Sequence, residues 1–211
     1  MSEANTAQVV PITGEHLEIL QEFTNIAVGR SAAALAELLD MFVTLTVPRV
    51  EIVTTEEVYR ILTAFSEEGT GACAVEQLFR GDLNGQAIMV MSNRGLANLR
   101  TALLSPEEIE DLGEDEAKRE VLLEVGNLVI SSATGMLIEL LGGQMAFAPP
   151  RVLLEGLQAP SDAKTRPALL VDTRLETAEI GVEGRVAVIQ DPNSSEWLGE
   201  SLERAVEELS K

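Results

Sequence analysis

A short polar signature occurs twice in this chain, 102 positions apart, within Ala- and Leu-rich segments that have helical spacing. Each copy places a Glu three residues before an Asn. The four residues are Glu22, Asn25, Glu124 and Asn127. The match continues downstream in one frame, since 37–39 (Glu-Leu-Leu) recurs at 139–141 and 48–50 (Pro-Arg-Val) recurs at 150–152. We therefore interpret the chain as an internal duplication in which each half begins with a long helix.

The repeated Glu and Asn are the best candidates for functional residues. An i, i+3 spacing places both side chains of a pair on one helix face. Asn is a mediocre helix former, so an interior Asn that recurs at matched positions needs a reason. A single such pair is more often part of a solvated helix surface, but the repetition in register favours a site.

Periodicity and capping signals predict the same order of elements in each half. Helices are expected at about 15–40 (with Thr13 as N-cap), 96–104, 105–113, 114–141 and 196–209. Strands are expected at 43–47, 49–53, 71–79, 86–91, 152–154, 167–178 and 184–190. Residues 57–61 fit either a short helix or a strand. The prediction is an α+β fold with pseudo-two-fold symmetry, whose long helices pack on an antiparallel sheet. It is one domain, 1–211, made of two repeats at about 13–104 and 105–211.

The charge of the chain excludes several classes of partner. Asp and Glu number 35 against 15 Lys and Arg, which gives a formal net charge of -20. Nucleic acids and anionic membrane surfaces both require clusters of Lys and Arg, so neither is expected as a partner. The sequence shows no secretory signal at its start and no obvious membrane span, and we expect a cytoplasmic protein.

The single Cys and the single His are not expected to do chemistry. Cys73 lies in a strand-like segment, where a small buried hydrophobe is the simplest role. His16 stands at a helix start and is expected on the surface, and with no second His a metal site is not predicted.

The arrangement of these residues resembles the CheC/CheX/FliY family, whose members are phosphatases of the chemotaxis response regulator CheY. The resemblance rests on E-x-x-N early in a long helix, followed after about 22 residues by a Pro. In the first half this Pro opens the strand at 47–53, Val-Pro-Arg-Val-Glu-Ile-Val. The resemblance covers nearly the whole chain. The presence of two such sites in one chain is similar to the CheC members of the family.

Two departures from the family pattern bear on the sites. Glu18 and Glu120 occupy positions where the family commonly has Asp or Ser, which keeps a carboxylate one turn before the motif. The family often has Gly just before the Asn. Gly126 keeps it in the second half, whereas the first half has Thr24, so we expect the first site to fit its partner less well.

The resemblance implies a chemistry for the four residues. Asn25 and Asn127 would each orient a water for attack on an aspartyl phosphate, because a carboxamide offers both a donor and an acceptor. Glu22 and Glu124 would dock the phosphorylated receiver domain, most simply through its active-site Lys. The chain itself would need no cofactor, since Mg²⁺ is expected on the receiver. The family also implies CheD, a receptor deamidase, as a second partner.

Two other functions remain open from the sequence. One is a non-catalytic adaptor of the same fold that binds a receiver or CheD in a signalling complex. The other is an acidic scaffold protein. A phosphatase requires each Glu and Asn exposed on one helix face, whereas buried pairs would favour the scaffold. The sequence does not specify which receiver is the substrate.

Overall fold

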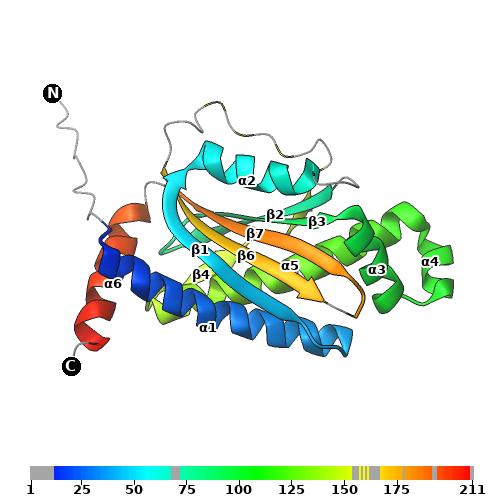
Figure 1. Ribbon diagram of the computed structural model, residues 1–211, viewed down its shortest axis with the longest axis horizontal. Helices are drawn as coiled ribbons and strands as arrows, with labels where there is room; N and C mark the ends of the chain where they lie inside the picture. Colours follow the sequence, from blue (N-terminus) through cyan, green and yellow to red (C-terminus); the bar gives the residue numbers. More distant parts are fainter. Residues whose placement is uncertain are drawn as a thin grey trace.

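The computed structural model describes residues 12–67, 72–153, 157, 159, 161, 167–177, 179–191 and 194–209. Figure 1 shows three layers, with a sheet between the long helices α1 and α5 on one face and α2 on the other. The helices are α1 (Gly14–Leu39), α2 (Thr55–Glu67), α3 (Asn93–Leu103), α4 (Pro106–Leu112), α5 (Glu114–Leu140) and α6 (Ser195–Leu209). The strands are β1 (Thr44–Thr54), β2 (Ala72–Gly81), β3 (Gly85–Ser92), β4 (Met145–Phe147), β5 (Arg151–Val152), β6 (Pro167–Thr177) and β7 (Val182–Gln190). The predicted α+β class is confirmed.

The strand pairing exchanges strands between the two halves of the chain. All pairs are antiparallel and follow the order β1-β6-β7-β3-β2-β4, with β5 also paired to β2. The hairpins β2–β3 and β6–β7 meet through β3 and β7. Val50 of β1 pairs with Val171 in the second hairpin, and Val152 of β5 pairs with Val75 in the first. A pseudo-two-fold relation between halves produces this pattern. The exact limits of the repeats, about 13–104 and 105–211, stay a prediction.

Helix ends follow the capping signals in the sequence. Thr13 caps α1 in a capping box with His16, and Ser105 caps α4 in a second box with Glu108. The backbone hydrogen bond at Ser105 lowers the pKa of Glu108 below its ordinary value. The expected surface position of His16 is wrong: its side chain is 2% exposed, because Nδ1 accepts the Thr13 amide while Nε2 lies 3.5 Å from Glu203 of α6.

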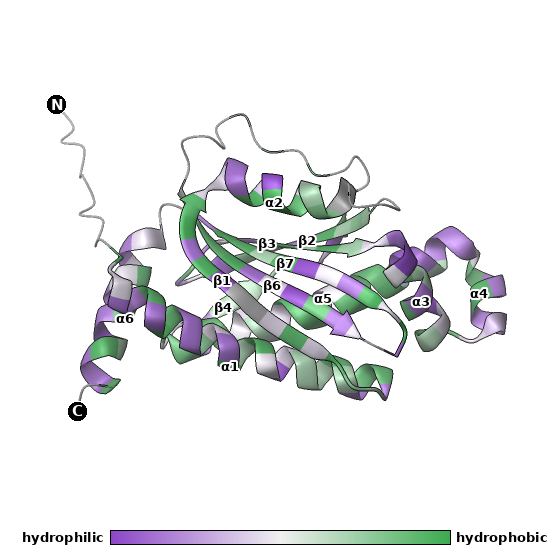
Figure 2. Cartoon of the chain, viewed as in Figure 1, coloured by the Kyte–Doolittle hydropathy of each residue, from purple (hydrophilic) through white to green (hydrophobic). Residues whose placement is uncertain are grey.

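The core has two parts, one on each face of the sheet. The larger part fills the space between the sheet and α1 and α5, and the smaller lies under α2. Figure 2 shows that α5 is apolar over most of its length, whereas α4 is largely polar. Within the described residues, α5 is the one helix long and apolar enough to cross a membrane by length and composition. Half of that stretch is buried here, which is what a core helix of a globular fold shows. The sequence had suggested no such segment.

Several element predictions were refined. The ambiguous segment 57–61 is helical and belongs to α2. The two expected strands at 43–47 and 49–53 form one strand, β1, with a register irregularity between Thr46 and Arg49. The three-residue strand β4 was not predicted. Of the expected strand at 152–154, Leu154 lies outside the described residues.

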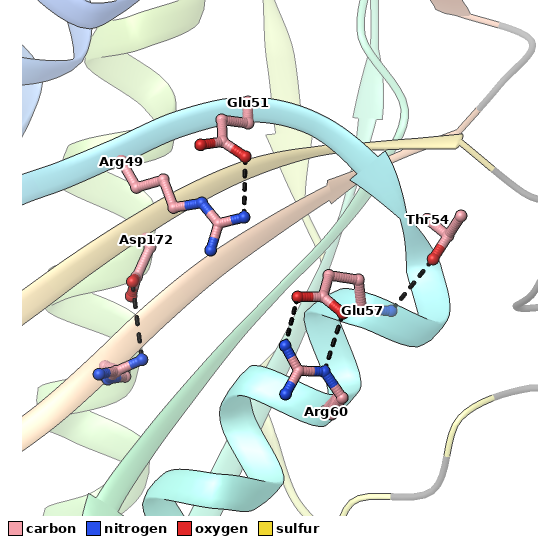
Figure 3. A network of polar contacts seen from close by, with 7 residues as sticks. Arg49, Glu51, Thr54, Glu57, Arg60 and Asp172 are labelled. Carbon is pink, nitrogen blue, oxygen red and sulfur yellow. Dashed lines mark hydrogen bonds and ion pairs between the residues drawn. The ribbon is translucent and has the colours of Figure 1, made fainter.

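The repeated Pro-Arg-Val segment places an Arg opposite a buried acidic residue in each half. Arg151 lies in register with Glu76 and forms an ion pair with it. Arg49 lies in register with Asp172 in the same way. Arg49, however, forms a hydrogen bond with Glu51 (Figure 3), with 2.8 Å between the two atoms. The Asp172 carboxylate pairs with Arg185 at 3.6 Å. The Arg151–Glu76 pair therefore joins β5 to the opposite hairpin, whereas the ion pairs of Arg49 and Asp172 stay within β1 and within the β6–β7 hairpin.

Candidate functional site

All four predicted site residues are exposed on the two long helices. Glu22 and Asn25 lie on the outer surface of α1, and Glu124 and Asn127 lie on that of α5. The residues between them, such as Thr24 and Val125, are buried towards the sheet. The exposed arrangement is the one that a phosphatase requires, and the buried arrangement that would favour a scaffold is not found.

The two helices lie side by side and run in opposite directions (Figure 1). They touch where the Ser31 hydroxyl lies 2.8 Å from the Ser132 hydroxyl and donates to the Val129 carbonyl at 3.2 Å. Asn25 lies six residues before Ser31 on one helix, and Asn127 lies five residues before Ser132 on the other. At about 1.5 Å per residue, the two Asn residues therefore stand on opposite sides of this contact, roughly 16 Å apart along the helix pair.

The second site is a groove between the helices. Glu124 and Asn127 of α5 line it together with Glu37 and Leu38 of α1. Glu37 is exposed and adds a second carboxylate to the groove, beside Glu124 and the Asn127 amide, from the other half of the chain. Its recurrence at Glu139 was the signal in the sequence that could have identified it.

The Asn127 side chain also accepts a hydrogen bond from the sheet beneath α5. Gln77 of β2 is 1% exposed, and its Nε2 donates to the Asn127 Oδ1 at 2.8 Å and to the Ala148 carbonyl at 3.1 Å. No local pattern in the sequence links Gln77 to Asn127, because they are 50 residues apart.

The first site has a looser arrangement. The Asn25 Oδ1 accepts a hydrogen bond from Gln21, one turn earlier on the same helix, at 3.4 Å and at an exposed position. Ile26 beside it is 47% exposed, so an apolar side chain stands next to the polar pair.

Gly126 and Thr24 face the core and not a docking partner. The expectation that Thr24 makes the first site fit its partner less well is therefore wrong in its reason. A Cβ on Gly126 would stand 2.3 Å from the Val75 Cγ1, so Gly126 is what lets α5 approach the sheet closely. Thr24 is 1% exposed and lines a cavity of about 20 Å³ with Thr134. Among the described residues, the buried hydroxyls of both threonines have no hydrogen-bond partner.

Known proteins share this sequence pattern and fold. No protein-family model matches the chain. It is 29% identical over 174 residues to the CheY-P phosphatase CheC of Bacillus subtilis, covering 78% of this chain and 81% of CheC. The fold is that of FliY from Thermotoga maritima, with a TM-score of 0.67 and 22% identity over 91% of this chain and 98% of FliY. The chain is therefore similar in sequence to CheC and has the CheC-like fold that FliY and CheX share.

A CheC-like fold also occurs in FliM from H. pylori, solved in a complex with SpeE. That likeness has a TM-score of 0.63 and 9% identity, and it covers 92% of this chain and 97% of FliM. At this level of identity it shows a shared fold alone.

Two of the positions where this CheC-like chain departs from the family pattern are solvent-exposed, whereas the third, Thr24, is buried. Glu18 and Glu120 both lie on the outer surface, one turn before the motif Glu of each site. Each site therefore carries two exposed carboxylates on one helix, and the second gains a third from Glu37.

Cys73 has the properties of a structural thiol in this CheC-like chain. It is partly buried, somewhat less than expected, and its Sγ donates to the Met91 carbonyl at 3.4 Å. Burial raises the pKa of the thiol from 9.0 to about 11. The thiolate is scarce at neutral pH, so this side chain is a poor nucleophile.

Proposed function

We propose that this chain is a phosphatase that hydrolyses the aspartyl phosphate of a CheY-type receiver domain. The observation that carries the proposal is the exposure of both Glu–Asn pairs on the outer faces of α1 and α5. The relationship to Bacillus subtilis CheC, a CheY-P phosphatase, supports it.

In the proposed reaction, Asn25 or Asn127 orients a water in line with the phosphorus. The oxygen of that water forms a new bond to phosphorus as the bond to the receiver Asp breaks, which releases inorganic phosphate and a free carboxylate. The carboxamide can accept from the water and donate to a phosphoryl oxygen at once. Orientation of this kind can lower a barrier by several kcal/mol. We place the Mg²⁺ of the reaction on the receiver.

The acidic side chains would select and align the partner. Glu22 and Glu124 would each pair with a cation on the receiver, most simply the Lys of its active site. Glu37 extends the negative surface of the second site. A net charge of -20 would also speed encounter with a basic surface at low ionic strength. We propose a cytoplasmic location on the same ground, since the receiver partner would be found there.

A second candidate is a non-catalytic adaptor of the same fold, which would bind a receiver or CheD. The similarity of the fold to FliM, which was solved in a complex with SpeE, supports this alternative. The altered Glu18 and Glu120 positions are the sequence features that favour it.

One assay separates the two candidates. A panel of receivers is phosphorylated with a small acyl phosphate and Mg²⁺, and the loss of phosphate is followed with and without this chain. The phosphatase proposal predicts faster loss from at least one receiver at substoichiometric amounts of the chain. An adaptor would bind the phosphorylated receiver and leave the phosphate lifetime unchanged or longer.

A further inference from the structure

We propose that Gln77 presets the carboxamide of Asn127 and thereby makes the second site the more active of the two. The inference concerns a positioning residue on the sheet, which does not itself reach the surface. The predicted effect on turnover rests on the proposed phosphatase function. The fixed orientation of the Asn127 carboxamide does not depend on that function.

A backbone carbonyl determines the orientation of both amides. The Ala148 oxygen can only accept, so the group of Gln77 that faces it at 3.1 Å must be its NH₂. The second hydrogen of that NH₂ points to Asn127, whose oxygen must therefore face inward, at 2.8 Å. The Nδ2 of Asn127 and one lone pair of its Oδ1 remain for water and phosphoryl oxygens. The direction of the carboxamide is thus fixed before any partner arrives.

Close packing of α5 on β2 makes this contact possible. Val75 and Gln77 are two residues apart on β2 and face α5 together. Gly126 has no Cβ to meet Val75, and the neighbouring residue, Asn127, therefore comes within hydrogen-bond distance of Gln77.

The energetics argue against a purely structural role for Gln77. Its Oε1 is buried and has no hydrogen-bond partner among the described residues. An unpaired buried polar atom is costly, and an apolar side chain of similar size would fill the same space without that cost. The two bonds of its NH₂ are what the residue provides, and one of them goes to a predicted catalytic side chain.

The first site lacks an equivalent. The symmetric strand pairing places Thr173 where the second site has Gln77, and Thr173 lines the cavity beside Thr24. Among the described residues, the hydrogen bond of Asn25 is to Gln21 on the surface, at 3.4 Å. Its carboxamide is therefore held by one long, solvent-exposed hydrogen bond, which restrains it less than the buried bond of Asn127.

The kinetic test measures Gln77→Met in chains with one functional site. Met keeps the length and volume of the side chain and removes the donor. In an Asn25→Ala background, where only the second site can act, Gln77→Met should lower kcat by about tenfold and leave KM for the phosphorylated receiver within about twofold. In an Asn127→Ala background the same change has no preset carboxamide to disturb, so its effect should disappear.

Gln190→Met is the matched control. Gln190 is also buried in this sheet, and its Nε2 bonds Ser195 at 3.3 Å, away from both sites. It should leave kcat unchanged in the Asn25→Ala background. Equal losses from Gln77→Met in both backgrounds, or from the two Met variants, would show general destabilisation and overturn the proposal. An unchanged kcat, or no activity from the second site, would overturn it too.

A second measurement needs no substrate. The side-chain NH₂ order parameter of Asn127 by ¹⁵N relaxation should be near that of rigid backbone, about 0.8, and that of Asn25 below about 0.6. Gln77→Met should lower the Asn127 value to that of Asn25. Equal values in the wild type would refute the preset carboxamide even if phosphatase activity is found. A preset carboxamide in a chain that hydrolyses no receiver would instead count against the proposed function.

Discussion

At the residue scale, the two sites differ in what lies beneath the Asn. Asn127 accepts a hydrogen bond from the buried Gln77, whereas Asn25 accepts a solvent-exposed one from Gln21. The sequence pointed to a less effective first site because of Thr24, but Thr24 is buried and cannot obstruct a partner. The ranking of the sites stays a prediction, with a different physical reason.

We therefore expect Asn127→Ala to cost more activity than Asn25→Ala. A fixed carboxamide spends more of its time in the productive orientation, so removing it should lose at least about threefold more turnover. The comparison is single-variant turnover on one receiver at matched concentration. Equal losses, or a larger loss from Asn25→Ala, would reverse the ranking without affecting the phosphatase proposal.

At the scale of elements, the position of α5 depends on one missing side chain. Gly126 stands against Val75, which is β-branched and fully buried, so it cannot move aside easily. The contact between a helix and the sheet thus sets the geometry of a surface site.

Gly126→Ala should push α5 away from β2. Overpacking of this kind costs about 1–3 kcal/mol in the free energy of unfolding, partly offset by the better helix propensity of Ala. It should also lower turnover at the second site, because the Asn127–Gln77 bond lengthens. Denaturant unfolding and turnover in an Asn25→Ala background measure the two effects.

Gly135→Ala on the same helix is the control. A Cβ there meets Phe147 at an ordinary 3.7 Å, so the change should be neutral or slightly stabilising. If both variants unfold alike, Gly126 does not set the approach of α5.

Local signals predicted most of the elements, and tertiary contacts explain what was missed. Thr13, Ser105 and the apolar spacing located the helices, because capping and amphipathicity act within a few residues. β4 is three residues long and forms only because the edge of β2 is available. Gln77 was missed because its partner depends on how β2 and α5 pack. His16 was misplaced because the α6 contact that buries it comes from the far end of the chain.

At the scale of the whole molecule, the halves are joined by exchanged strands. Arg151 of the second half pairs with Glu76 in the first hairpin, and Glu76 is buried. A buried carboxylate that loses its partner is costly, so this pair matters more to stability than exposed pairs do.

Arg151→Ala should lower the free energy of unfolding by about 1–3 kcal/mol, because the Glu76 carboxylate is left unpaired. Adding Glu76→Gln should recover part of the loss. Arg60→Ala, which removes an exposed pair with Glu57, should leave stability almost unchanged. Denaturant titration of the four chains decides this, and equal effects of Arg151→Ala and Arg60→Ala would show that the Arg151 pair does not join the halves.

The central claim is that two exposed Asn side chains carry out the hydrolysis. The most direct measurement is the rate of phosphate loss from a receiver that the wild type dephosphorylates, with the Asn25→Ala/Asn127→Ala double variant in its place. Both positions are exposed, so the fold should persist, as circular dichroism can check. The predicted result is that phosphate loss falls to the rate of the receiver alone, although the double variant still binds it. Dephosphorylation at the wild-type rate by a folded double variant would contradict the account.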